Sequence, residues 1–140
     1  MRRYLVVANQ TLCGEALFAE LRARAEGGPC SFHLVVPATH PHELSNHIER
    51  HARDQAQQRL DAALARLADV DAEVTGEVGD ASPILAIQDA LIAREADEII
   101  LSTLPAGVSR WLRRDLPHRV ERRFELPLIL VVAQEEPAHQ

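Results

Sequence analysis

Arginine is the residue type whose number and spacing point most directly to chemistry. All 15 basic residues of the 140-residue chain are Arg, and six of them fall between Arg110 and Arg123. A guanidinium group donates parallel hydrogen bonds to phosphate oxygens, so Arg113 and Arg114 are candidates for holding an anionic ligand. The alternative interpretation is a solvated helix face, because acidic residues are interleaved with these arginines.

The absence of lysine excludes several kinds of enzyme. A Schiff-base enzyme, a lysine general base and a P-loop with its phosphate-binding Lys cannot be built from this chain. The spacing of the other polar residues suggests no nucleophile elbow, no paired catalytic carboxylates and no Ser-His-Asp arrangement. We therefore expect a protein that is not an enzyme.

Histidines crowd one segment in the first half of the chain. They are His40, His42, His47 and His51. His47 and His51 are four residues apart and would share one helix face, a spacing that suits zinc. No cysteine or clearly spaced carboxylate completes a ligand set, so we expect exposed histidines and no metal, and keep a metal-responsive module as a further hypothesis.

The two cysteines are too few for a disulfide framework. Cys13 comes just before a predicted helix, where the pKa of a thiol can fall and make it reactive. The alternative is a small residue that fills space. Cys30 follows Pro29 at the start of a predicted strand, and we expect it to be inert.

Apolar, β-branched runs alternate with segments of helical period. The runs lie at residues 4–8, 32–36, 72–78, 98–101 and 128–132, and the helical segments at 15–25, 44–67, 84–92 and 116–124. This alternation predicts an α/β fold: a single domain over residues 1–140 with one open five-stranded parallel sheet and helices on both faces. The third run alternates, with Thr75 and Glu77 on one face, which favours an edge strand.

Charge and hydropathy exclude two classes of partner. The net charge is −6, which gives no overall attraction to a nucleic-acid backbone. The apolar runs are far shorter than the roughly 20 residues that cross a bilayer. We expect a cytoplasmic protein with neither nucleic acid nor membrane as a partner.

The predicted fold also indicates where a ligand would bind. Open parallel sheets take ligands outside the carboxyl ends of their strands, where the strand order reverses. If the first and fourth strands are neighbours, residues 9–14 and 102–109 line that crevice. Asn9, Thr11, Ser102 and Thr103 could then hydrogen-bond a ligand, although such side chains also satisfy turns and caps.

The order and spacing of several segments resemble the universal stress protein family, which includes ATP-binding and non-binding branches. The segments are residues 4–11, 33–37, 79–84, 96–101 and 126–132, so the resemblance spans nearly the whole chain. It implies a Rossmann-like strand order of 3-2-1-4-5 and places Asn9 where the family has an adenine-side Asp. It also puts Val36 and Gly107 near the ligand, and makes ATP or AMP a possible cofactor.

The family's nucleotide motif is not retained. That motif is Gly, two residues, Gly, nine residues, then Gly and Ser or Thr, and without gaps it falls on Leu101, Leu104, Arg114 and Asp115. Gly107 lies three residues late. Asp115 is the predicted N-cap of helix 116–124, where its carboxylate would occupy the free amides and repel a phosphate.

These observations favour a non-enzymatic binding or regulatory module that does not bind ATP in the family's manner. The alternative is a nucleotide-binding stress regulator that holds phosphates through Arg113 and Arg114. The resemblance also implies a homodimer through residues 127–132, because family members commonly pair through their last strand and an apolar edge needs covering.

Overall fold

The computed structural model describes residues 1–38, 46–105 and 107–133 of the chain. Its elements in chain order are β1 (Arg2–Val7), α1 (Glu15–Glu26), β2 (Cys30–Pro37), α2 (Asn46–Arg66), β3 (Glu73–Gly79), α3 (Pro83–Ala93), β4 (Glu98–Thr103), α4 (Arg110–Arg113), α5 (Leu116–Phe124) and β5 (Leu128–Val132). The predicted alternation of strands and helices is confirmed. The short helix α4 was not predicted.

The five strands form one parallel sheet with the order β3-β2-β1-β4-β5, as predicted. β1 lies in the middle, with Val7 opposite Val35 of β2 on one side and Leu101 of β4 on the other. β3 is an edge strand, which confirms the interpretation of its alternating sequence. The strand order reverses between β1 and β4, so the carboxyl ends of these two strands flank the place where such folds bind ligands.

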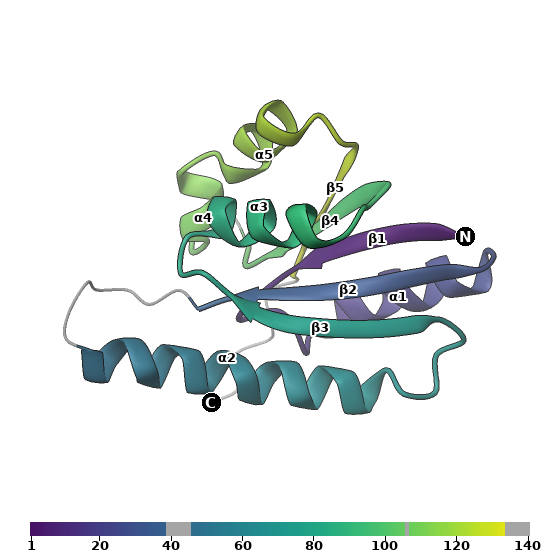
Figure 1. Ribbon diagram of the computed structural model, residues 1–140, viewed down its shortest axis with the longest axis horizontal. Helices are drawn as coiled ribbons and strands as arrows, with labels where there is room; N and C mark the ends of the chain where they lie inside the picture. Colours follow the sequence, from purple (N-terminus) through teal and green to yellow (C-terminus); the bar gives the residue numbers. More distant parts are fainter. Residues whose placement is uncertain (39–45, 106, 134–140) are drawn as a thin grey trace.

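Helices cover both faces of the sheet (Figure 1). On one face, Val6, Leu34 and Ile100 belong to the core beneath α1 and α2. On the other face, Leu5 and Ile99 pack with buried residues of α3 and α5. Central strands buried from both sides explain why their sequences read as continuous apolar runs.

β1 begins earlier than predicted, because Arg2 and Arg3 already pair in register with Cys30 and Ser31 of β2. These polar residues extend the strand by backbone pairing, a feature that an apolar pattern does not reveal. The predicted helix over 44–67 is observed as α2 from Asn46, and residues 44 and 45 lie outside the described part of the chain.

Close packing places the start of α3 at the carboxyl end of β3. Gly79 ends β3, and a Cβ atom at this position would lie 2.9 Å from the Cβ of Ala86. The glycine therefore lets α3 approach the sheet closely. Ser82 caps the helix by accepting a hydrogen bond from the Leu85 N–H at 3.4 Å, and Pro83 follows at its first position.

None of the helices in the described ranges combines the length and the apolar character needed to cross a bilayer.

Candidate functional site

A cavity of about 890 Å³ opens at the carboxyl ends of β1 and β4. Its walls come from α2, the start of α3, and the segment from the end of β4 through α5; the lining residues are Asn9, Gln10, Thr11, Gln55, Arg59, Ala81, Ser82, Pro83, Ile84, Ser102, Thr103, Leu104, Val108, Ser109, Arg110, Trp111, Arg113, Arg114, Leu116 and Arg119. We call this cavity the crevice. Its place agrees with the general rule for ligand sites in open parallel sheets.

Buried polar groups at the strand ends form the floor of the crevice. The hydroxyls of Thr11 and Ser102 are 2.6 Å apart and join the loop after β1 to β4. Asn9 donates from Nδ2 to the carbonyl oxygen of Pro37 at 2.7 Å, and its Oδ1 accepts from a guanidinium nitrogen of Arg59 on α2. The floor is therefore fixed by hydrogen bonds among β1, β2, β4 and α2.

Two further hydroxyls bind the backbone around them. Thr103 donates to the carbonyl oxygen of Leu104 at 3.0 Å. Ser109 accepts from the Leu112 N–H at 3.1 Å and so caps α4. This cap explains why a helix begins at Arg110, which places Arg110 and Arg113 one turn apart at the crevice.

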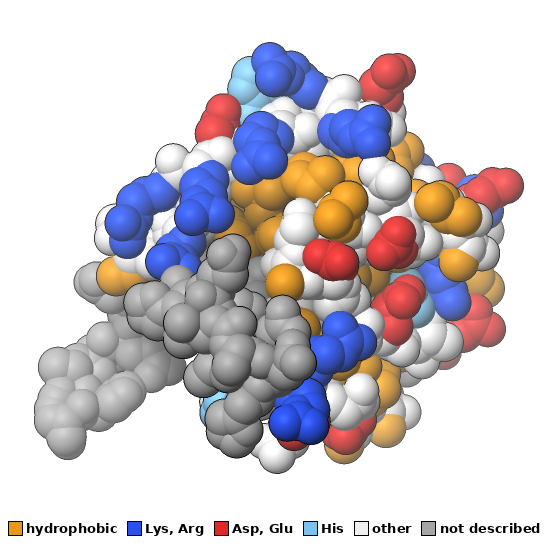
Figure 2. Space-filling view, turned by 60° about the vertical axis from the view of Figure 1, so that its left-hand side comes forward, with side chains coloured by type: hydrophobic (Ala, Val, Ile, Leu, Met, Phe, Trp, Pro, Cys, Tyr) orange, Lys and Arg blue, Asp and Glu red, His pale blue; other side chains and the backbone are white. Residues whose placement is uncertain are grey.

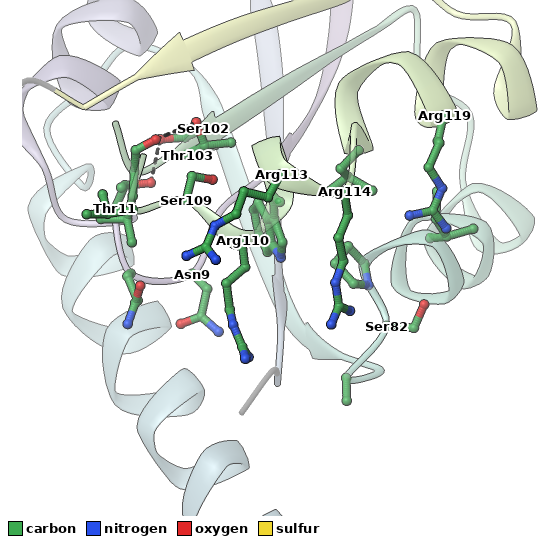
Figure 3. Close-up of a pocket in the computed structure, with 18 of the residues that line it drawn as sticks. Asn9, Thr11, Ser82, Ser102, Thr103, Ser109, Arg110, Arg113, Arg114 and Arg119 are labelled. Carbon is green, nitrogen blue, oxygen red and sulfur yellow. Dashed lines mark hydrogen bonds between the residues drawn. The ribbon is translucent and has the colours of Figure 1, made fainter. Parts of the chain in front are cut away.

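Arginines supply the charge of the crevice. Arg59 comes from α2, Arg110 and Arg113 from α4, Arg114 from its C-cap and Arg119 from α5. Figure 3 shows Arg110, Arg113, Arg114 and Arg119 extending from α4 and α5 along one side of the cavity, with Asn9 and Thr11 at one end and Ser82 at the other. Figure 2 shows blue Arg side chains gathered around an apolar surface on the face of the molecule that it presents.

Within the described part of the chain, carboxylates do not balance the charges of Arg113, Arg114 and Arg119. Among the described residues that line the crevice there is no Asp or Glu. Within the same described part of the chain, Arg113, Arg114 and Arg119 form no ion pair. A partly enclosed group of guanidinium ions attracts an anion more strongly than a solvated surface does.

The structure brings together six of the residues that the sequence assigned to a ligand site. Asn9, Thr11, Ser102, Thr103, Arg113 and Arg114 all line the crevice. The other three are not among its described lining residues. Val36 is fully buried in the core beneath α2, Gly107 lies in the loop between β4 and α4 with a φ of 96°, and Asp115 joins α4 to α5.

The predicted role of Asp115 is wrong. Asp115 does stand at the N-cap of α5, but its backbone is left-handed, with φ 56° and ψ 39°, and its side chain bonds no helix amide. The carboxylate instead accepts from Nδ1 of His118 at 3.3 Å. Because Asp115 must join two helices through a tight left-handed corner, its side chain is turned away from the N-cap geometry, which needs an extended backbone.

Sequence reasoning missed part of the crevice wall. Arg59 and Gln55 lie four residues apart on α2, a spacing that places them on one helix face, but nothing in the sequence indicates that this face reaches the crevice. Arg119 belonged to the basic cluster but was not singled out. Its position one turn into α5 depends on the corner at Asp115.

The structure does not support the reactive-thiol alternative for Cys13. Cys13 lies just before α1, and its thiol is 3.6 Å from the carbonyl oxygen of Arg59. Desolvation raises the pKa of this thiol and outweighs the opposing positive charges of Arg66 and Arg59. The thiol is therefore not activated.

The histidine cluster falls mostly outside what the structure describes. His40 and His42 lie outside the described residues, and the side chain of His47 is not described either. His51 is exposed on α2. Within the described part of the chain, no group of three His, Cys, Asp or Glu side chains could hold a metal ion.

Comparison with known proteins identifies the fold. No family model matches the sequence, and no curated protein matches it. Among solved structures, a universal stress protein family protein from Arabidopsis thaliana with AMP bound has a TM-score of 0.65 and 11% identity, over 96% of this chain and 93% of that one. The universal stress protein UspA from Lactobacillus plantarum has a TM-score of 0.62 and 20% identity, over 93% and 97%.

A protein from the universal stress protein family of Burkholderia pseudomallei has a TM-score of 0.61 and 17% identity, over 92% of this chain and 94% of that one. The chain therefore has the fold of the universal stress proteins, over nearly its whole length. At these identities the likeness concerns the fold.

Proposed function

We propose that this chain is a non-enzymatic binding module whose crevice holds a small anionic ligand through arginine side chains. The observation that carries this proposal is the group of arginines on α4 and α5 that faces the crevice without a carboxylate among its described lining residues. In a protein with a net charge of −6, arginines gathered along one cavity create a local positive potential. Such a potential favours binding of an anion.

The floor and the wall of the crevice have different capacities to bind. On the floor, Thr11 and Ser102 already hydrogen-bond each other, and Asn9 bonds Pro37 and Arg59. On the wall, the guanidinium groups of Arg113 and Arg114 have no described ion-pair partner. The strongest contacts available to a ligand are thus charge-assisted hydrogen bonds to its anionic end.

A nucleotide is the second, more specific candidate ligand. The fold is shared with a protein whose structure has AMP bound, and the crevice is large enough for a nucleotide. In this version of the proposal, Arg113 and Arg114 bind the phosphate, and the neutral polar end near Asn9 and Thr11 receives the nucleoside. The positions of the family's glycine motif hold leucine and arginine here, so guanidinium groups replace backbone amides as phosphate ligands.

Calorimetric titration distinguishes the two versions. AMP, ATP and inorganic phosphate are each titrated into the wild type, Arg114→Ala and the control Arg53→Ala, which removes one exposed arginine of α2 outside the crevice lining. Binding of AMP or ATP that is lost in Arg114→Ala but kept in Arg53→Ala supports the nucleotide. Binding of phosphate with no gain from the nucleoside supports a different anionic ligand.

Failure of all three anions to bind, or equal weakening by both substitutions, overturns the proposal that the crevice is an anion site. The comparison of two arginine variants matters because any loss of positive charge weakens anion binding slightly through long-range attraction. A specific contact loses far more than a distant charge does.

We also propose that two copies of the chain pair through β5. β5 is an edge strand of five apolar residues, and its Leu130 and Val132 are 40% and 39% exposed. An apolar edge of this kind tends to be covered by another strand.

Sedimentation at micromolar concentration should give twice the mass of 15.5 kDa, and Leu130→Asp should shift the equilibrium toward the monomer. A monomer in the wild type would overturn this proposal.

A further inference from the structure

Three polar side chains form a continuous hydrogen-bonded row at the β3 edge of the sheet, and none of them lines the crevice. His33 of β2 is opposite Thr75 of β3 in the strand register. Its Nδ1 is 2.7 Å from the Thr75 hydroxyl oxygen, and its Nε2 is 2.7 Å from a carboxylate oxygen of Glu77. His33 is only 7% exposed, so both ring nitrogens depend on these partners.

The partners decide which ring nitrogen carries the proton. An ionised carboxylate only accepts hydrogen bonds, so Nε2 of His33 donates to Glu77. In the neutral ring Nδ1 then has a free lone pair and accepts from the Thr75 hydroxyl. This is the order of hydroxyl, imidazole and carboxylate in which an imidazole can take the proton of the hydroxyl while the carboxylate stabilises the resulting cation.

The Thr75 hydroxyl can be reached from outside. Thr75 is exposed, and no described strand lies beyond β3. Nη1 of Arg94, at the end of α3, lies 3.5 Å from the same hydroxyl oxygen. Because this guanidinium donates to the Thr75 oxygen, it leaves the Thr75 proton directed at Nδ1 of His33 and favours negative charge on the attacking oxygen.

We propose that Thr75 is an acyl-acceptor site, at which the hydroxyl takes an acyl group from an activated donor such as an acyl phosphate or a thioester. A bond forms between Oγ1 of Thr75 and the carbonyl carbon, and the bond from that carbon to the leaving oxygen or sulfur breaks. The Thr75 proton passes to Nδ1 of His33 and then to the leaving group. The products are a Thr75 ester and the free phosphate or thiol, with no oxidation or reduction.

This arrangement was not visible from spacing, since His33 lies 42 residues before Thr75 and 44 before Glu77. The signal that the sequence does carry is the alternation that puts Thr75 and Glu77 on one face of β3. Only the strand register places His33 between them. A purely structural role for His33 would stabilise the sheet edge without making Thr75 react.

The test uses the full chain and p-nitrophenyl acetate, with separate arms for acetyl phosphate and for an acetyl thioester. We expect at most one p-nitrophenolate per chain in the fast phase, and mass spectrometry should place the acetyl group on Thr75. Thr75→Val should lose the adduct and Thr75→Ser should keep it. Glu77→Gln and His33→Gln should slow the reaction by roughly 100-fold, the usual size of general-base assistance.

Ser31→Ala is the matched control, because Ser31 precedes His33 by two residues on β2 and so presents a hydroxyl on the same face of the sheet. It should react like the wild type.

Circular dichroism identifies any variant that fails to fold, and Thr75→Ser and Glu77→Gln keep the test decisive if His33→Gln does not fold. An acetyl group on another residue, or equal rates in wild type and Glu77→Gln, overturns the proposal. If the wild type reacts with p-nitrophenyl acetate and with either acetyl phosphate or the thioester, that result identifies the class of donor. If the wild type reacts with none of the three donors, the proposal is also overturned.

Discussion

Arginines have different surroundings at the two ends of the sheet. At the amino end, Arg2 contacts Glu98 at 2.8 Å and Arg3 contacts both Asp97 and Glu95 at 3.1 Å. At the carboxyl end, several arginines face a cavity that has no carboxylate among its described lining residues. The difference separates arginines that hold the fold together from arginines that are available to a ligand.

Electrostatics explains why the two groups of arginines should differ in their attraction for an anion. An arginine already paired with a carboxylate has little attraction left for an anion, while an unbalanced group of arginines repels itself and is relieved when an anion binds. Ligand binding and stability should therefore respond to substitutions at opposite ends of the sheet. The following changes test that separation.

The largest effect is expected from replacing both Arg113 and Arg114 by Ala. Each charge-assisted hydrogen bond contributes about 1.5–3 kcal/mol, so the pair should weaken binding of a phosphate-bearing ligand by roughly 100-fold or more. The free energy of unfolding without ligand should stay the same or rise, because like charges are removed. Calorimetry and urea unfolding measure the two quantities, and an equal loss of binding in Arg2→Ala would erase the distinction between the ends.

A smaller effect, and on stability alone, is expected from Glu98→Ala. The Glu98 side chain is 9% exposed and contacts Arg2 and, at 3.6 Å, Arg24. Removing it leaves two cations without their shared partner, and because Arg2 is half exposed we expect a loss of about 1–3 kcal/mol in the free energy of unfolding. Glu95→Ala is the control, since its exposed ion pair should contribute about 0–1 kcal/mol. Ligand affinity should not change in either variant.

The sequence predicts the strands of the sheet better than it predicts the loops and the short helix that form the crevice. Continuous apolar runs identify central strands because both faces of each are buried, and the resemblance supplied the strand order that is observed. The crevice depends instead on short local geometry. α4 has four residues, too few for a helical period, and the left-handed corner at Asp115 decides where the next helix points.

Contacts between distant segments explain the remaining failures. Arg59 meets Asn9 across 50 residues, and His33 meets Thr75 only because β2 and β3 pair in one particular register. A one-residue slip would turn Thr75 to the opposite face and separate the two. Register is a property of the assembled sheet. The sequence therefore shows the residue types, but it does not show that His33 and Thr75 come into contact.

A still smaller effect should come from the crevice floor. Ser102→Ala leaves the buried Thr11 hydroxyl without its partner at 2.6 Å and should cost about 1 kcal/mol in the free energy of unfolding. The double variant Thr11→Val with Ser102→Ala should recover part of this loss, because no unpaired hydroxyl remains. Anion affinity should fall far less than in the arginine variants. A loss as large as that of Arg114→Ala would mean that the floor, and not the arginine wall, holds the ligand.

The smallest effect concerns pH at the amino end. The Arg3 side chain, with help from the Arg3 backbone N–H, lowers the pKa of Asp97 from its ordinary value of 3.8 to about 2. A carboxyl group with a lowered pKa in the folded state stabilises the protein above the unfolded value, and this contribution disappears as the pH falls through the folded value. The stability difference between wild type and Asp97→Asn should thus be full above pH 3.8 and shrink toward pH 2.

Arg3→Gln separates this ion pair from general acid denaturation, because it removes the main cause of the shift and leaves Asp97 in place. Urea unfolding across this pH range should then show a smaller difference between Arg3→Gln and its Asp97→Asn double variant than between wild type and Asp97→Asn. If the two differences were equal at every pH, Arg3 would not stabilise the ionised form of Asp97. The amino end would then owe its stability to packing, and the contrast between its arginines and those of the crevice would rest on the Glu98 site alone.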